Sequence, residues 1–421
     1  MASPAWDATG GDPSKRPIVL ITGPRRSGKT SVHHVVFHKL SPHETMFLGA
    51  TMSVLPEHIG HNELVHFEVW DLPGDHGLAS DIVMDDGTVC SADEALSRCG
   101  ALIFVVDAQE GVDDDTAELL RDIGRRVVAH APSLSVDVFV HKIDGDALAT
   151  PEARVQAQSD AQVGLSRALR ESGLGGFAVA FHATSVYDGS VFEAVSRVVQ
   201  RLLPQRPALT SVLDSFVTMS GMEAAAVYDV VTKVHLARDS HGRGEAMADL
   251  ISDALDVVVD VSCIYGVKGA REAAAAGGAA SGEGEDGAAA GGGAEGSEAG
   301  DGRGGEEDGE AAGEEEDEDE DGFQFDGMTE SLVSLADGKT LVLRSVGPYL
   351  ALVAVAPSPD AVAGARLGAV DCNVEIVRKA MRDLFAGGPA GGFASLMLPP
   401  PAGAARSDEG SVISAAGSIN V

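Results

Sequence analysis

The chain has 421 residues, of which 44% are hydrophobic and 5% aromatic, and its formal net charge is −35. A length well beyond one typical core predicts two folded domains with irregular segments, and this hydrophobic content excludes a wholly disordered protein. The negative charge argues against a nucleic-acid partner, because it would repel the phosphate backbone.

Residues 1–16 are expected to form a flexible N-terminus, and residues 17–206 a first folded domain. In this domain short apolar runs alternate with helical stretches. Three of the five predicted strands are nearly continuous runs of Val, Ile, Leu and Phe, which is typical of strands covered on both faces. The pattern predicts an α/β fold with a doubly wound, mainly parallel sheet. The predicted strands are 18–22, 64–70, 101–107, 136–142 and 177–185.

The segment GPRRSGKT, residues 23–30, matches the pattern GxxxxGK[ST] between the first predicted strand and a helix that begins near Lys29. In such a loop the backbone N–H groups and the helix N-terminus face an anion. Lys29 can then reach the β and γ phosphates of a nucleotide, and Thr30 can offer its hydroxyl to Mg²⁺. The tandem Arg25 and Arg26 either add charge around the phosphates or face solvent.

The motif DLPG follows the second predicted strand and begins with Asp71. A carboxylate at the end of a strand can hold the water shell of a metal, and Gly74 can present its N–H to a γ phosphate. The alternative is that Asp71 only forms a turn at the strand end.

The motif HKID ends the fourth predicted strand with Asp144. A carboxylate there can accept hydrogen bonds from N1–H and N2–H₂ of guanine, a pair of donors that adenine lacks, which disfavours a P-loop kinase or ATPase. The stem of Lys142 can lie along the ring. The motif TSVYD ends the next strand, where Ser185 and the backbone of Val186 could meet the other edge of the base.

The last helix of the first domain is predicted from a capping-box pattern of Ser190 and Glu193 and an apolar stripe that stops before Pro204. Residues 204–211 are interpreted as a linker. A second domain, 207–386, is predicted to be α+β, because strands follow one another with helices at both ends. Its predicted elements are a helix near 211–220, a strand at 228–237, an apolar segment at 245–265, strands around Leu332, Leu341 and Leu350, and an amphipathic helix at 373–385.

Residues 269–322 interrupt the second domain with an acidic, glycine-rich tract that contains almost no side chain able to pack. Such a composition predicts a disordered insert, because burial cannot offset the loss of chain entropy. The tract is either a solvated spacer or an acidic docking segment. Residues 387–421 are expected to form a flexible tail.

The four cysteines are scattered without metal-site spacing, which favours reduced thiols inside the cell. No signal peptide, membrane-spanning stretch or lipidation motif is evident, so we expect no direct membrane insertion. His34 and His38 stand four residues apart on the first helix and could bind a metal. We expect instead that these histidines pack against neighbouring side chains or face solvent, because no third ligand is near in sequence.

Taken together, the motifs resemble small GTPases, and more closely the Rag GTPases of the C/D type. The similarity covers residues 15–268 and 328–385 and lies in RRSGKTS, VVFHKLSPHETMFL, DLPG, ALIFVVDAQ, HKID, TSVYD and DVVVDVSCIYG. His141 stands where most small GTPases have Asn, as in Rag proteins, and the paired Arg is also a Rag feature. An extra stretch at 79–97 lies outside the resemblance.

The resemblance implies a GTPase domain that binds GTP or GDP with Mg²⁺, followed by a roadblock/longin-like dimerisation domain. It implies a heterodimer with an A/B-type Rag GTPase that signals amino-acid supply to the target-of-rapamycin kinase complex. The expected location is the cytoplasm and, through a scaffold complex, the lysosomal or vacuolar membrane, with the nucleus as a further location.

Carried over by position, Thr51 is the switch threonine that closes on Mg²⁺ and the γ phosphate. The residue expected to orient the attacking water is usually Gln, but here it is Asp75, which predicts slow hydrolysis or a noncatalytic scaffold. Metal binding is assigned to Thr30, Thr51 and, through water, Asp71. The nucleotide-binding residues are Gly23, Arg26, Ser27, Gly28, Lys29, Thr30, Ser31, Thr45, Gly74, His141, Lys142, Asp144, Ser185 and Val186.

Overall fold

A computed structural model of the chain describes residues 16–62, 65–74, 78, 81–241, 251, 254, 330–385 and 396–399. These residues belong to one compact unit. Within them, no helix combines the length and the apolar character that crossing a bilayer requires. The predicted acidic insert, most of both predicted flexible termini and most of the apolar segment 245–265 lie outside the described residues. Residues 396–399 of the predicted tail are described and packed, because Met397 is buried and the N–H of Leu398 donates to the side chain of Asn373 at 2.7 Å.

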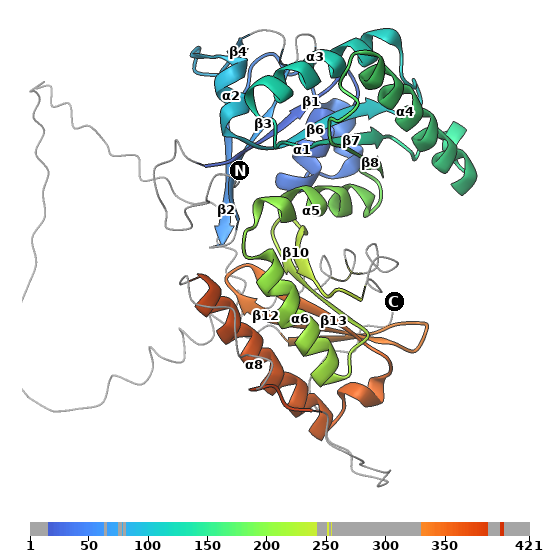
Figure 1. Cartoon of the computed structure of the whole chain (residues 1–421). Coiled ribbons are helices and arrows are strands. Elements are labelled where there is room, and N and C mark those ends of the chain that lie inside the picture. Colours follow the sequence, from blue (N-terminus) through green and yellow to red (C-terminus); the bar gives the residue numbers. More distant parts are fainter. Residues whose placement is uncertain are drawn as a thin grey trace, which may run out of the picture. The chain divides into compact units, whose positions relative to one another are not determined.

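The first sheet has six strands in the order β2-β3-β1-β6-β7-β8 (Figure 1). All neighbouring pairs are parallel except β2 with β3, so the prediction of a mainly parallel sheet is confirmed. The strand β2 was not predicted. The strands are β1 (Ile18–Thr22), β2 (Glu57–Asn62), β3 (Val65–Asp71), β6 (Cys99–Asp107), β7 (Val136–His141) and β8 (Val179–Thr184).

Helices cover both faces of this sheet. Alternate residues of each central strand point to opposite faces, so each strand presents apolar side chains to the helices on both. In β1, Val19 and Ile21 pack with α1 and α5, whereas Ile18 and Leu20 pack with α2, α3 and α4. Both sets are buried, which explains why the strand carries no polar alternation. The helices are α1 (Lys29–Phe37), α2 (Ala92–Arg98), α3 (Asp114–His130), α4 (Pro151–Glu171) and α5 (Ser190–Leu202).

The expected capping box of α5 does not form. Gly189 is the N-cap and offers no side chain. The N–H of Ser190 instead donates to the carboxylate of Asp188 at 3.0 Å. The helix itself forms as predicted, because its apolar stripe is buried against the sheet.

The segment that lies outside the family resemblance contains a hairpin of β4 (Ile82–Val83) and β5 (Val89–Cys90), followed by α2. This hairpin contacts the segment just after Thr51. The N–H of Val54 donates to the carbonyl of Val83 at 2.9 Å, and Ser53 donates to the carboxylate of Asp85 at 2.9 Å. These two hydrogen bonds therefore hold the hairpin against the segment that carries Thr51, the predicted switch threonine.

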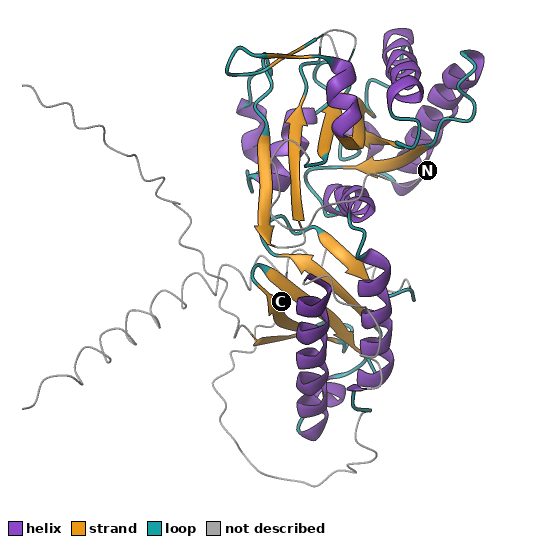
Figure 2. Cartoon of the chain, turned by 60° about the vertical axis from the view of Figure 1, so that its left-hand side comes forward, coloured by secondary structure: helices purple, strands orange, loops and turns teal. Residues whose placement is uncertain are grey.

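The second sheet is antiparallel, with the strand order β10-β9-β13-β12-β11. Two long helices pack together and against this sheet (Figure 2), in agreement with the α+β arrangement expected from sequence. Their buried side chains include Phe216 and Met381. The elements are α6 (Arg206–Ser220), β9 (Ala224–Asp229), β10 (His235–Arg238), β11 (Glu330–Ser334), β12 (Thr340–Gly347), β13 (Leu350–Ala356) and α8 (Ala365–Phe385).

Two sequence-based expectations for this part differ from the structure. The predicted linker 204–211 is largely the first turn of α6, because Pro207 is tolerated in the first turn of a helix. The predicted strand 228–237 is a hairpin, in which β9 ends at Asp229 and β10 begins at His235. The carboxylate of Asp229 accepts hydrogen bonds from the N–H and hydroxyl of Thr232 and so fixes the turn.

The helix α5 and the strand β10 are joined by buried polar contacts. The hydroxyl of Ser196 accepts from the N–H of His235 at 2.9 Å, and Gln200 donates to the carbonyl of His235 at 3.0 Å. Arg238 pairs with Glu193 at 2.9 Å. Without these bonds the same polar groups would be buried with no hydrogen-bond partner. The bonds therefore favour one packing arrangement of α5 against β10.

Candidate nucleotide-binding site

The loop between β1 and α1 depends on two glycines with left-handed backbone angles. Gly23 has φ 141° and Gly28 has φ 102°. A Cβ on Gly23 would lie 2.2 Å from the carbonyl oxygen of Val105, and one on Gly28 would lie 2.5 Å from Cδ2 of His141. The loop therefore rests directly on β6 and on His141, with no room for a side chain at either position.

The N-terminus of α1 has no side-chain cap, because its N-cap is Gly28. The first N–H groups of a helix lack partners within the helix, and together with the helix dipole they favour a bound anion. The Nζ of Lys29 donates to the carbonyl of Pro24 at 2.8 Å, across the loop. A Cβ on Gly74 would lie 2.9 Å from Nζ of Lys29 and 2.7 Å from Cα of Arg25, so the DLPG turn closes over the loop.

Three oxygen-bearing side chains meet beside Lys29. The hydroxyl of Thr30 donates to Oδ2 of Asp71 at 2.6 Å, and the hydroxyl of Thr51 donates to the same oxygen at 3.0 Å. The two hydroxyl oxygens are 2.7 Å apart. The Oδ1 of Asp71 is buried, and no hydrogen-bond partner is found for it among the described residues. Hydroxyl and carboxylate oxygens are the ligands that Mg²⁺ prefers, so this group fits that ion.

The predicted base-binding residues lie at the ends of β7 and β8. Asp144 is exposed, and its Oδ1 accepts from the hydroxyl of Ser185 at 2.5 Å. The same hydroxyl accepts from the N–H of Tyr187 at 3.0 Å. Val186 is buried beneath this turn. The carboxylate is thus fixed from one side, and its second oxygen can accept hydrogen bonds from a base.

Lys142 connects the base motif to the phosphate loop. Its backbone is left-handed, with φ 62°, and its Nζ donates to the carbonyl of Arg26 at 2.6 Å and to Oδ2 of Asp107 at 2.6 Å. Arg26 also has φ 62°, an uncommon conformation for a residue with a side chain. The second arginine of the pair therefore contributes a backbone carbonyl that holds the loop against the HKID motif.

The imidazole of His141 fills the space under Gly28 and bonds through Nδ1 to the hydroxyl of Thr184 at 3.0 Å. Burial, together with the charge of Lys142, lowers the pKa of His141 to about 4. The ring is therefore neutral at physiological pH, and no second positive charge is added beside Lys142.

Most of the residues predicted from sequence lie at the carboxyl ends of the parallel strands, where ligands of such sheets bind. Thr45 differs, because it lies in a 3₁₀ helix (Pro42–Phe47) and its hydroxyl donates to Pro42 of the same helix at 2.7 Å. Asp75 lies outside the described residues. Asp107 was missed, although its place at the end of a buried strand is a signal that could have found it.

A family model described as the Gtr1/RagA G protein conserved region matches residues 18–255. The chain belongs to the Gtr1/RagA family. It is 38% identical over 260 residues to "Ras-related GTP-binding protein C" of Homo sapiens. This match covers 62% of each chain. It is 38% identical over 248 residues to "GTP-binding protein gtr2" of Schizosaccharomyces pombe, covering 59% of this chain and 75% of the relative.

Identity is lower to the other branch of the family. "GTP-binding protein gtr1" of S. pombe is 26% identical over 212 residues, which covers 50% of this chain and 64% of the relative. The higher identity to proteins C and gtr2 makes this chain a Rag GTPase of the C/D type. Its matched part spans 62% of the length of the human relative.

Proposed function

We propose that this Rag protein is a guanine-nucleotide switch that binds GTP and GDP with Mg²⁺ and hydrolyses GTP slowly. The observation that carries the proposal is Lys142, which joins the predicted base motif to the phosphate loop through Arg26 and Asp107. Through this contact, the motif proposed to read the base is joined to the loop and helix end proposed to bind an anion, at one edge of the sheet.

Each part of the site has a distinct task in this proposal. The loop N–H groups and Lys29 hold the phosphates, and Lys29 exchanges its bond to Pro24 for phosphate oxygens. The carboxylate of Asp144 accepts from the two guanine donors, while Ser185 keeps it in place. Thr30, Thr51 and Asp71 would hold Mg²⁺, which neutralises charge on the phosphate oxygens when it is bound.

The hydroxyl of Thr51 bonds to Asp71 and Thr30. The segment that carries Thr51 is therefore held beside the residues proposed to bind Mg²⁺. Loss of the γ phosphate and its metal contacts would release this segment, which gives the two states of a switch. The slow rate follows from Asp75, a shorter and negatively charged residue where a neutral Gln would orient water. The same residue favours the second candidate, a nucleotide-bound scaffold with negligible hydrolysis.

The wider role also belongs to the proposal. Membership of a family that includes both gtr2-like and gtr1-like proteins supports a heterodimer with an A/B-type Rag GTPase. The antiparallel sheet with α6 and α8 is proposed to be the roadblock/longin-like dimerisation domain. Within that heterodimer the protein would report amino-acid supply to the target-of-rapamycin kinase complex. It would be cytoplasmic, and would reach the lysosomal or vacuolar membrane through a scaffold complex.

The test is nucleotide binding and single-turnover hydrolysis by the purified full chain. Fluorescent mant-GTP and mant-GDP should bind with an affinity that depends on Mg²⁺, and mant-ATP should bind far more weakly. Equal binding of mant-ATP would overturn the guanine assignment. The variant D75Q should hydrolyse GTP faster than the natural chain if the chain is a slow enzyme, whereas no hydrolysis by either form favours the scaffold.

Heterodimer formation has its own test. Co-expression with an A/B-type Rag GTPase should yield a complex that elutes from size-exclusion chromatography with one copy of each chain. A protein that stays monomeric beside a folded A/B-type partner would refute the heterodimer without affecting the nucleotide assignment.

A further inference from the structure

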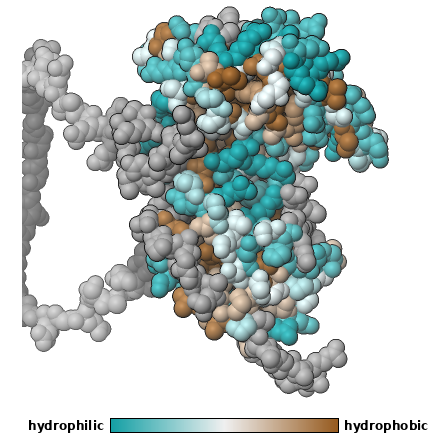
Figure 3. Space-filling model, viewed as in Figure 1, coloured by the Kyte–Doolittle hydropathy of each residue, from teal (hydrophilic) through white to brown (hydrophobic). Residues whose placement is uncertain are grey.

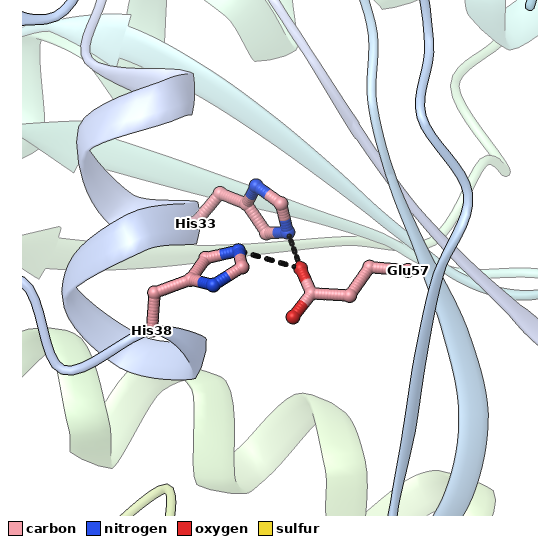
Figure 4. Close-up of side chains that lie close together, drawn as sticks. All are labelled: His33, His38 and Glu57. Atoms are coloured by element: carbon pink, nitrogen blue, oxygen red, sulfur yellow. Dashed lines mark ion pairs between the residues drawn. The ribbon is translucent and has the colours of Figure 1, made fainter. Parts of the chain in front are cut away.

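A cluster of two histidines and one glutamate lies between the C-terminal end of α1 and the start of β2 (Figure 4). His33 lies in α1, His38 follows the last residue of this helix, and Glu57 is the first residue of β2. The Nε2 atoms of His33 and His38 lie 2.6 Å and 2.9 Å from the same oxygen, Oε2 of Glu57. Figure 4 shows both imidazoles directed toward that carboxylate.

The cluster is only partly open to solvent. The side chain of His33 is 9% exposed, that of Glu57 22% and that of His38 43%. Nε2 of His33 and Oε2 of Glu57 are buried, and neither has a partner in hydrogen-bond geometry among the described residues. Two buried polar atoms in contact without a good hydrogen bond call for an explanation, and an unseen ion is one of the usual ones.

The chemistry of the three ligands is that of a transition-metal site. Imidazole nitrogens with one carboxylate suit Zn²⁺ and related ions, and they are a poor match for Mg²⁺, which prefers oxygen ligands. The three ligand atoms lie within 4.8 Å of one another. Bonds of about 2.1 Å in a tetrahedron separate ligand atoms by about 3.4 Å, so the two histidine–glutamate contacts need to lengthen by less than about 1 Å.

Metal binding requires both imidazoles to be neutral, because a protonated ring nitrogen has no lone pair to offer a cation. The exposed side of His38 leaves access for a water molecule as the fourth ligand.

We propose that His33, His38 and Glu57 form a binding site for a divalent transition metal of the Zn²⁺ class, with water completing the tetrahedron. The site would fasten the end of α1 to the start of β2. The same helix carries Thr30 in its first turn, and Thr51 lies six residues before Glu57. The bound metal would therefore tie together the two segments whose hydroxyls meet at Asp71. This inference does not depend on the proposed nucleotide.

His34 provides a matched control. Its ring stacks on that of His38, with centroids 4.7 Å apart, but it is not one of the three residues whose ligand atoms converge. The variant H34Q thus removes a histidine from the same helix without removing a predicted ligand. E57Q removes the anionic ligand at nearly constant size, and H38Q removes the most exposed ligand with the least risk to folding.

The experiment is a titration of the chelator-treated full chain with Zn²⁺ by isothermal calorimetry. Excess Mg²⁺ is present, so that the proposed Mg²⁺ site at Thr30, Thr51 and Asp71 (the oxygen-rich site) stays filled. The natural chain and H34Q should share a site that E57Q and H38Q weaken by at least about tenfold. Circular dichroism in the absence of Zn²⁺ verifies that each variant is folded. Unchanged Zn²⁺ affinity in folded E57Q and H38Q, or an equal loss in H34Q, would overturn the assignment.

Cobalt provides an independent reading of the ligands. Co²⁺ bound to the natural chain should give the intense visible bands of tetrahedral nitrogen and oxygen coordination, without thiolate charge transfer, and E57Q should lose them. Strong thiolate bands, or the weak bands of octahedral Co²⁺, would mean that the metal binds at cysteines or at the oxygen-rich site, and would reject the proposal.

Discussion

Replacing Asp144 by Asn isolates the contact that we assign to base recognition. The exposed carboxylate accepts from Ser185 through Oδ1 at 2.5 Å, and the amide oxygen of Asn can keep this bond. The other atom changes from an acceptor to an NH₂ donor, which would face the N–H donors of guanine. The substitution therefore alters recognition with little effect on the fold.

The magnitude follows from the two hydrogen bonds that the carboxylate is proposed to accept. Hydrogen bonds to a charged group contribute about 1.5–3 kcal/mol each. Losing both removes about 3–6 kcal/mol, which is roughly a 10²- to 10⁴-fold loss of affinity for GDP. Xanthosine nucleotides carry an oxygen where guanine has its exocyclic amine, so they should bind D144N better than they bind the natural chain.

The assay is a fluorescence titration with mant-GDP and mant-XDP in the presence of Mg²⁺. The neighbouring Asp146 is also exposed, and D146N serves as the control for the loss of one negative charge. If D144N binds mant-GDP as tightly as D146N does, Asp144 does not read the base, and the reasoning from its position at the end of β7 is wrong.

Three further predictions concern the proposed Mg²⁺ site, the buried His141 and His235, and the contact between α5 and β10. T51A should weaken the Mg²⁺-dependent part of GTP affinity by about tenfold, measured by titration with and without Mg²⁺, because it removes one of three oxygens. Burial lowers the pKa of His141 and of His235 to about 4, so between about pH 6.5 and 4 the unfolded chain binds more protons than the folded chain. The free energy of unfolding should therefore fall as the pH drops through this window, by up to about 1.4 kcal/mol per pH unit for each histidine, and H141N should show a smaller slope in urea unfolding. S196A should lower the free energy of unfolding by about 1–3 kcal/mol, because the buried N–H of His235 loses its acceptor.

Each of these has a matched comparison. T45A removes a hydroxyl that bonds within its own 3₁₀ helix, and it should leave Mg²⁺ dependence unchanged. S215A removes an exposed hydroxyl that bonds within α6, and its effect on stability should be small. An unfolding free energy that is flat between pH 6.5 and 4 would contradict the neutral, buried state of the two histidines. Equal stability of S196A and S215A would mean that the α5–β10 bond contributes nothing.

The sequence could predict where much of the candidate site lies, because most of its residues follow buried strands. Parallel strands place their carboxyl ends at one edge, so Asp71, Asp144 and Ser185 were brought near the loop by topology alone. What could not be predicted are contacts set by backbone conformation. The left-handed angles of Lys142 and Arg26 direct the lysine onto the loop carbonyl, and no residue pattern signals them.

The histidine cluster shows the same limit. Spacing on a helix suggested His34 with His38, but α1 ends at Phe37, and His38 turns with His33 toward a carboxylate on β2. The third member, Glu57, stands 19 residues further along the chain, on a strand that was not predicted. A short, polar edge strand such as EHIGHN lacks the apolar pattern on which strand prediction depends.

The contacts of Lys142 have a consequence for how nucleotide affinity is divided. Its ammonium group bonds to the loop that is proposed to hold the phosphates, while its backbone belongs to the motif that is proposed to read the base. Free-energy contributions are additive only for groups that share no partner. Binding free energies of guanosine and of pyrophosphate measured separately should therefore not sum to that of the whole nucleotide, since Lys142 links the two halves of the proposed site.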